Sequence, residues 1–204
     1  MNSYIESIRP EWVKKIVNRE KTFEVRKSAP KEVPFKVYIY CTKDRKNLLP
    51  IEHGKVLEKV NFWENTDAYY GFGKVIGEFI CDKVYSIKNQ GNSFVVANEE
   101  QGVTNEIARQ SCLDYDDMVG YLGNKDGYGW HISDLKIYDK PKELSEFSHI
   151  CSYKNDDGSC QCRKVDCLYQ QRDYNTDGSV NLVTCGKSIT RPPQSYMRVE
   201  ELGE

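Results

Sequence analysis

Four polar residues near the N-terminus carry groups that could hold a ligand: Lys21, Thr22, Glu24 and Arg26, in the segment KTFEVR. Side chains alternate between the two faces of a strand, so Thr22, Glu24 and Arg26 would share one face, with Lys21 at its edge. A lysine and an arginine beside a carboxylate can hold a phosphate or a base edge, and Glu24 could accept from an exocyclic amine. The alternative is a solvated strand face with an ordinary Glu–Arg ion pair.

A second candidate segment is GYGWH, residues 127–131. A flat aromatic ring flanked by glycines is what a stacking platform for a base requires, so Tyr128 and Trp130 are candidate ligand-binding residues. His131 could hydrogen-bond the base or act as an acid–base group near neutral pH. The alternative is that Trp130 completes the core and His131 is a satisfied polar neighbour.

The segment RPPQS, residues 191–195, is the third candidate. Its two prolines fix an extended approach to a last strand. Gln194 and Ser195 would then offer hydrogen-bond donors and acceptors to a ligand at the rim of the sheet. A purely structural strand start explains the same residues.

Five of the eight cysteines are crowded into residues 151–185. Four thiolates can bind Zn²⁺ tetrahedrally, and metal binding would help to fold a polar segment that has few apolar residues of its own. The spacing matches no standard paired site, so free or disulfide-prone thiols and an iron–sulfur cluster stay open as alternatives. The predicted zinc ligands are Cys160, Cys162, Cys167 and Cys185, with Cys151 as a substitute for one of them.

Short elements must position these residues. Apolar residues at helical spacing behind a proline predict a helix over 10–18. A cap at Asp114 or Ser111 with a following Gly-Asn pair predicts a second helix over 114–122. Gly77 suggests a bulge or sharp bend in its strand. Together the pattern predicts an α+β protein with a small, highly curved sheet or barrel. The predicted strands cover residues 21–26, 35–42, 73–87, 127–138 and 191–200.

Composition limits the function classes. The chain has 204 residues, 39% of them hydrophobic, with 29 basic and 31 acidic side chains. This composition argues against disorder, and no apolar run is long enough for a transmembrane helix. A net charge of −2 argues against a broad nucleic-acid track and for a small pocket that holds one base or nucleotide. The absence of an N-terminal apolar segment predicts a cytoplasmic protein without membrane partners, whose thiols stay reduced.

Several of these motifs resemble the ASCH family of the PUA-like superfamily. They are SIRP at 7–10 with the helix after it, EKTFEVR at 20–26, VYIY at 37–40 and GKVIGE at 73–78. GWHISDL at 129–135 and RPPQS are similar to the larger ASCH proteins of phages and bacteria. The resemblance covers residues 5–147 and 189–201, and it implies a small β-barrel whose mouth binds a nucleobase, a nucleotide or an RNA segment. Arg19 departs from the usual glycine of the family, so Asn18 is expected to supply the turn.

The resemblance also bears on catalysis. Some small ASCH proteins are amidohydrolases of N-acylated cytidine, with a lysine at the position of Lys21 and a threonine nucleophile three residues later. Here that position is Glu24, and no clear acid precedes the second predicted helix, Glu106 being the nearest. The resemblance therefore favours binding over catalysis. A nucleic-acid-related hydrolase, either amidohydrolase-like or a ribonuclease, is the alternative, with Lys21, Glu24 and His131 as its catalytic candidates.

The predicted organisation is a barrel of residues 1–148 and 189–204, interrupted by a loop insertion at 44–73 and a Cys-rich insertion at 149–188. The first functional hypothesis is a module that binds RNA, a modified nucleoside or a nucleotide. The second hypothesis is the nucleic-acid-related hydrolase. The third is a phage accessory protein that contacts a host protein through the Cys-rich insertion.

Overall fold

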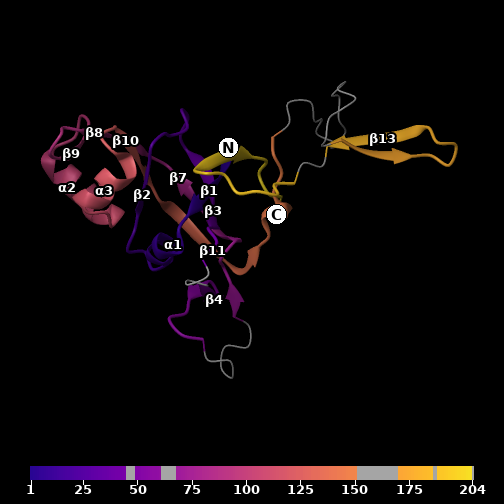
Figure 1. Ribbon diagram of the computed structural model, residues 1–204, viewed down its shortest axis with the longest axis horizontal. Coiled ribbons are helices and arrows are strands. Elements are labelled where there is room, and N and C mark those ends of the chain that lie inside the picture. Colours follow the sequence, from indigo (N-terminus) through magenta and orange to yellow (C-terminus); the bar gives the residue numbers. More distant parts are fainter. Residues whose placement is uncertain (45–48, 61–67, 151–169, 186–187, 204) are drawn as a thin grey trace.

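The structure, a computed structural model, describes residues 1–44, 49–60, 68–150, 170–185 and 188–203 (Figure 1). Its largest sheet has the strand order β11-β7-β3-β1-β14. The central strand β3 runs parallel to β1 and antiparallel to β7. The strands of this sheet are β1 (Asn2–Ile8), β3 (Phe35–Cys41), β7 (Val75–Cys81), β11 (Ser133–Lys142) and β14 (Tyr196–Val199).

A second, antiparallel sheet has the order β2-β10-β8-β9. Its strands are β2 (Phe23–Arg26), β8 (Val84–Asn89), β9 (Phe94–Val96) and β10 (Gly127–His131). At two places the chain crosses between the two sheets directly from strand to strand, because β7 continues into β8 after two residues and β10 continues into β11 after Ile132. The predicted strand over 73–87 is therefore two strands in different sheets, and so is the one over 127–138.

The α+β class is confirmed, but a closed barrel is not found: the described strands form separate sheets, and none closes on itself. The two crossings turn the chain sharply, so the curved arrangement predicted from the sequence arises from corners between sheets. Gly77 lies beside a register shift between β3 and β7, as expected for a bulge. A Cβ atom at Gly77 would lie 2.4 Å from the carbonyl oxygen of Lys136, so a side chain there would force the strands apart.

In the described ranges three α-helices cover the sheets: α1 (Pro10–Val17), α2 (Gln101–Ser111) and α3 (Tyr115–Leu122). Pro10 begins α1, as predicted. Of the two predicted caps of α3, Asp114 is the one used, through a capping box with Asp117. Helix α2 was not predicted, because its buried positions include Thr104 and Ser111 rather than a clear apolar stripe. After α1 the left-handed conformation is adopted by Arg19 itself, with φ of 61°, and not by Asn18.

Both faces of the central sheet are buried. Phe35, Val37 and Ile39 of β3 pack against α1 and Trp130 on one face. The alternate residues Tyr38 and Tyr40 pack on the other face in a second cluster that includes the region of the 3₁₀ helix Leu144–Glu146. Because both faces of β3 are buried, its sequence is an almost continuous run of apolar and aromatic residues.

Two smaller sheets complete the described chain. The predicted loop insertion 44–73 contains β4 (Pro50–Glu52), β5 (Lys55–Val56) and β6 (Tyr69–Tyr70), and its Leu49 and Ile51 reach the main core. The hairpin β12 (Gln170–Tyr174) and β13 (Val180–Cys185) lies within the Cys-rich segment, at the opposite end of Figure 1 from α2 and α3. No helix of the described ranges is long and apolar enough to cross a membrane.

Candidate functional site

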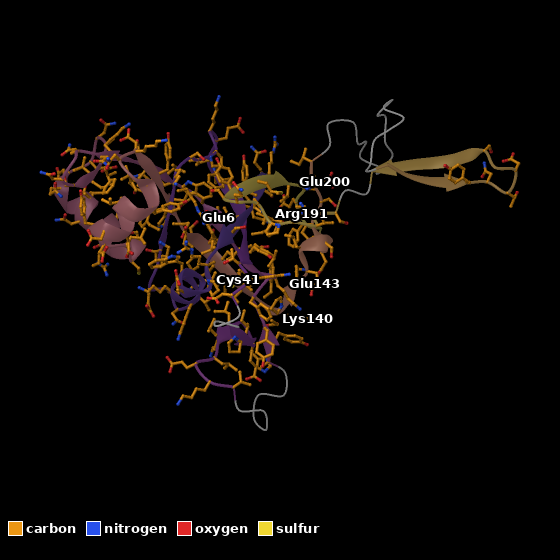
Figure 2. All side chains as sticks on the ribbon, viewed as in Figure 1. Glu6, Cys41, Lys140, Glu143, Arg191 and Glu200 are labelled. Atoms are coloured by element: carbon orange, nitrogen blue, oxygen red, sulfur yellow. The ribbon has the colours of Figure 1, made fainter. Side chains whose placement is uncertain are left out.

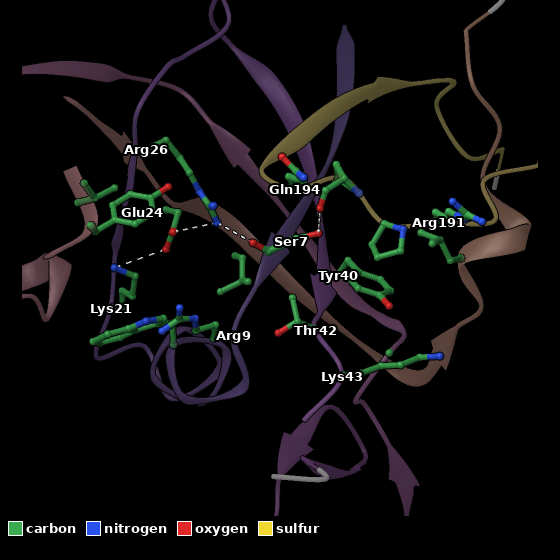
Figure 3. A pocket seen from close by; sticks show the side chains of 18 of the residues that line it. Ser7, Arg9, Lys21, Glu24, Arg26, Tyr40, Thr42, Lys43, Arg191 and Gln194 are labelled. Carbon is green, nitrogen blue, oxygen red and sulfur yellow. Dashed lines mark hydrogen bonds and ion pairs between the residues drawn. The ribbon is translucent and has the colours of Figure 1, made fainter. Parts of the chain in front are cut away.

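A cavity of about 1250 Å³ opens where the C-terminal ends of β1 and β3 meet β2 and α3 (Figure 3). Its walls come from segments far apart in the sequence: the end of β1, helix α1, strand β2, the residues after β3, helix α3 and residues 189–194. Lys21, Glu24 and Arg26 lie on one side of it, and we call them the buried end of the pocket.

The buried end is a row of alternating charges. Nζ of Lys21 lies 3.5 Å from Oε2 of Glu24, and Nη2 of Arg26 lies 3.1 Å from Oε1 of the same carboxylate. All three side chains are at least nine-tenths buried. The strand face that could have been solvated is therefore turned inward against α3 and β1, and its ion pairs are shielded from water and salt.

Arg26 is anchored from behind the pocket as well. Its Nε pairs with Oε1 of Glu6, and its Nη2 donates to the carbonyl oxygen of Ser7, 3.0 Å away. Glu6 and Ser7 belong to β1, so the guanidinium connects the two sheets. Although burial acts in the opposite direction, the carboxylates of Glu6 and Glu24 raise the pKa of Arg26 above its ordinary value.

Glu6 is the most deeply buried charge-bearing group, in the centre of the molecule (Figure 2). Burial raises its pKa to about 8, outweighing the favourable charge of Arg26, and the nearby Glu24 adds to the increase. The carboxyl of Glu6 is therefore largely protonated at neutral pH.

Lys21 is held in place by α2 and α1. Its Nζ donates to the carbonyl oxygen of Ser111, the last residue of α2, at 2.6 Å. It also lies 5.4 Å from the ring centre of Trp12, a half-buried residue of α1 that lines the pocket. The hydrogen bond gives the last carbonyl group of α2 a partner. Together with the contact to the ring of Trp12, it holds the ammonium beside Glu24.

At the buried end, Glu24 has an oxygen that is left with capacity to bind. Oε2 of Glu24 is buried and, among the described residues, accepts no hydrogen bond. Its nearest cation, Nζ of Lys21, is at ion-pair distance only. A buried carboxylate oxygen without a hydrogen bond is costly, so this atom favours a ligand that donates a hydrogen bond.

Of the other predicted ligand-binding residues, Gln194 lines the pocket. Ser195 does not, and its carbonyl oxygen accepts from the backbone N–H of Ser7 at 2.9 Å. Thr22 points to α2 instead, where its hydroxyl donates to Oε1 of Gln110 at 2.8 Å. Thus two of these three residues serve to join elements rather than to line the cavity.

The predicted stacking platform is not formed. Trp130 is completely buried and packs edge-on against Phe35 and Tyr196, so neither face of its ring is open to a base. Tyr128 is exposed but does not line the pocket, and Nδ1 of His131 lies 2.6 Å from Oδ1 of Asp82, also outside it. The buried Trp130 matches the alternative that it completes the core, because it packs in the main apolar cluster with Phe35.

Sequence reasoning missed several pocket residues. Trp12 and Tyr121 supply the aromatic walls, and Lys43 supplies a cation on the side away from Lys21. Arg191, which belongs to the predicted RPPQS segment, lies on the same side. The signal for Trp12 was its place on the apolar helix beside the KTFEVR motif. Lys43 carried no local signal, because only the meeting of β3 with residues 189–194 places it at a pocket.

The predicted zinc ligands fall mostly on residues whose structure is not described. Cys151, Cys160, Cys162 and Cys167 lie outside the described ranges, and Cys185 is placed only as the last residue of β13. In the described part of the chain no group of histidine, cysteine and carboxylate residues could hold a metal. The remaining cysteines Cys41 and Cys81 are buried, as expected for small apolar residues, and Cys112 is half-buried.

Together the fold and the pocket define an α+β protein with a charged cavity between two connected sheets. No protein-family model matches the sequence, and no curated protein matches it. Among solved structures, the chain is similar to ASCH from Zymomonas mobilis, with 17% identity, 70% of this chain and 73% of that chain covered, and a TM-score of 0.44. The chain is also similar to a mutant of that protein, with 16% identity, 71% of this chain and 77% of that chain covered, and a TM-score of 0.45. Both are structures of ASCH, the family that the sequence motifs resemble.

Proposed function

We propose that the protein is a binding module that holds a nucleoside, a nucleotide or a nucleotide unit of RNA in this pocket. The observation that carries the proposal is the row Lys21–Glu24–Arg26, buried at one end of a cavity of about 1250 Å³. Buried ion pairs contribute little to stability compared with apolar residues of the same size, so their presence at a cavity favours a role in recognition.

The geometry supports a particular kind of ligand edge. Oε2 of Glu24 needs a donor, and the ammonium of Lys21 beside it can donate. An amine next to an accepting ring nitrogen, as on cytosine, adenine or guanine and not on uracil, offers this donor–acceptor pair. The half-buried ring of Trp12 gives the base an aromatic wall, in the place of the buried Trp130.

A direct test is calorimetric titration of the purified chain with cytidine, guanosine, adenosine and uridine, and with a short single-stranded RNA. We expect saturable binding that prefers bases with an amine beside an acceptor. Glu24→Gln should weaken it by at least about tenfold, because a charged acceptor is replaced by a neutral amide. Glu106→Gln, which alters an exposed carboxylate on α2, is the matched control and should leave affinity unchanged.

Because Glu24 is buried, Trp12→Ala serves as a second variant whose fold is easier to preserve. It should weaken base binding while its far-ultraviolet circular dichroism stays native. Binding of none of the ligands by the folded native chain would contradict the proposal.

Hydrolysis is the second candidate function, and the specific observation in its favour is the contact between Nζ of Lys21 and the carboxylate of Glu24. A lysine and a carboxylate in contact can share a proton during attack on a carbonyl or phosphate. Release of cytidine from an N-acylated cytidine, or cleavage of the RNA, separates this function from binding alone. Either activity should be lost in Glu24→Gln. The third hypothesis, contact with a host protein through residues 149–188, stays a prediction.

A further inference from the structure

Two cations line the pocket on the side away from the buried end. Lys43 follows β3, Arg191 precedes the two prolines of the last segment, and both are exposed. Figure 3 shows them across the cavity from Lys21, with Tyr40 between them. In the described part of the chain neither makes an ion pair with a carboxylate, so both charges are available. We call these two residues the outer end of the pocket.

The backbone around the outer end holds these cations in position. The stem of Lys43 lies over Gly73, where a Cβ atom would come within 2.8 Å of Cε of the lysine. Pro192 and Pro193, which also line the pocket, restrict the chain next to Arg191. An arginine on a segment with restricted backbone needs less backbone ordering when it binds, and its planar group fits two oxygens of a phosphate.

The carboxylates that line the pocket repel an anion at one end of it only. Asp116 and Asp117 belong to the first turn of α3, near the buried end. At the outer end the only carboxylate that lines the cavity in the described chain is Glu143, and Lys74 neutralises it at 2.8 Å. A phosphate is therefore disfavoured beside α3 and favoured beside Lys43 and Arg191.

The size of the cavity agrees with a ligand that has two parts. About 1250 Å³ exceeds the roughly 300–1000 Å³ of pockets that hold one drug-sized molecule. A base bound at Glu24 would leave the outer end empty. The sugar and phosphate of a nucleotide extend away from the base and would fill that end.

We propose that the outer end binds a phosphate of the nucleotide whose base lies at the buried end, so that the ligand is a phosphorylated nucleotide unit and not a free nucleoside. This inference rests on the proposed function. The phosphate can come from a free mononucleotide or from the backbone of a single-stranded RNA. In both cases Lys43 and Arg191 donate charge-assisted hydrogen bonds to its oxygens.

The test compares four probes by calorimetry: cytidine, its 5′-monophosphate, its 3′-monophosphate and a short single-stranded RNA that contains cytosine. Guanosine and its phosphates replace them if guanosine is the better nucleoside. In the native chain we expect at least one phosphorylated probe to bind about tenfold or more tightly than the nucleoside. Added salt should reduce this advantage, because the outer end is exposed.

The variant carries K43Q and R191Q together, and its control carries K125Q and K136Q, which remove two exposed cations outside the pocket. We expect K43Q/R191Q to remove most of the phosphate advantage while nucleoside affinity stays within about twofold. The control should keep both. Stronger binding of the RNA than of either monophosphate identifies RNA as the source, and equal binding identifies the free nucleotide.

Three results are decisive against the inference. Equal affinity of nucleoside and all phosphorylated probes in the native chain would overturn it, and so would a phosphate advantage that survives in K43Q/R191Q. If the nucleoside still binds and depends on Glu24, only this inference fails. If no probe binds to the folded native chain, the proposed function fails with it.

Discussion

Nη2 of Arg26 lies 3.1 Å from Oε1 of Glu24 at the end of a pocket where both side chains are more than nine-tenths buried. The same guanidinium pairs with Glu6 of the neighbouring sheet. A single arginine thus holds two buried carboxylates and connects β2 to β1. This arrangement ties the stability of the two-sheet core to the electrostatics of the candidate site.

Replacement of Arg26 by methionine should destabilise the fold strongly. The variant leaves Glu24 without its closest cation, and it removes the contacts of the guanidinium with Glu6 and Ser7. Removal of one partner from a buried pair costs about 3–5 kcal/mol. Urea denaturation at pH 7 measures the change in the free energy of unfolding.

Two further variants control this prediction. Arg109→Met removes an exposed pair with Glu106 and should leave stability nearly unchanged. Arg26→Met combined with Glu24→Gln should be no more stable than Arg26→Met alone, because it leaves the buried ammonium of Lys21 without its carboxylate. Equal losses for the exposed and buried arginines would contradict the view that Arg26 connects the sheets.

Glu6 should make the protein less stable as the pH rises toward 8. Its folded pKa, about 8, lies above the value of 4.5 for a free carboxyl, so the folded state binds the extra proton between these values. The stabilisation by Glu6 is then complete below about pH 4.5 and is lost as the pH rises through 8, by on the order of a few kcal/mol.

Glu6→Gln, which mimics the protonated form, tests this dependence. Its free energy of unfolding should match that of the native chain near pH 5 and exceed it near pH 8.5. Glu58→Gln, at an exposed carboxylate, should keep the native pH profile. Parallel profiles for the native chain and Glu6→Gln would show that Glu6 is ionised throughout.

Trp130 should matter for stability and not for the ligand. Its ring is completely buried against Phe35 and Tyr196, so Trp130→Phe leaves a void and should cost about 1–3 kcal/mol. The affinity for the best nucleotide should stay within about twofold of native, measured below the unfolding transition. A loss of affinity without a change in unfolding would restore Trp130 as a contact residue.

The Cys-rich segment is predicted to bind a metal ion. We expect purified protein to contain about one zinc per chain by mass spectrometry of the metal content, because four thiolates complete a tetrahedral site. Cys160→Ser should lose the zinc and lower the midpoint of thermal unfolding of the segment. Cys112→Ser, outside residues 149–188, should keep it. A native protein without metal and with normal thermal stability would contradict the zinc prediction.

Local chemistry determined much of this protein. The proline at the start of α1, the capping aspartate of α3 and the alternation in KTFEVR each act within a few residues, so the sequence alone located these elements. The motif of Lys21, Glu24 and Arg26 could be found for the same reason. Helix α2 was not predicted, because its burial depends on contacts with β2 and β9 and not on a pattern of apolar residues in its own sequence.

The tertiary structure decided which groups face the ligand. Period-two alternation says that Glu24 and Arg26 share a face, but it cannot say whether that face meets water or α3. The same ambiguity applied to Trp130, whose glycine neighbours fit an open platform as well as a tight core. Lys43 and Arg191 are separated by most of the chain, and only the packing of β1, β3 and the last segment places both in one cavity. Burial and long-range neighbours set the electrostatics of a site, and neither is encoded in the spacing of adjacent residues.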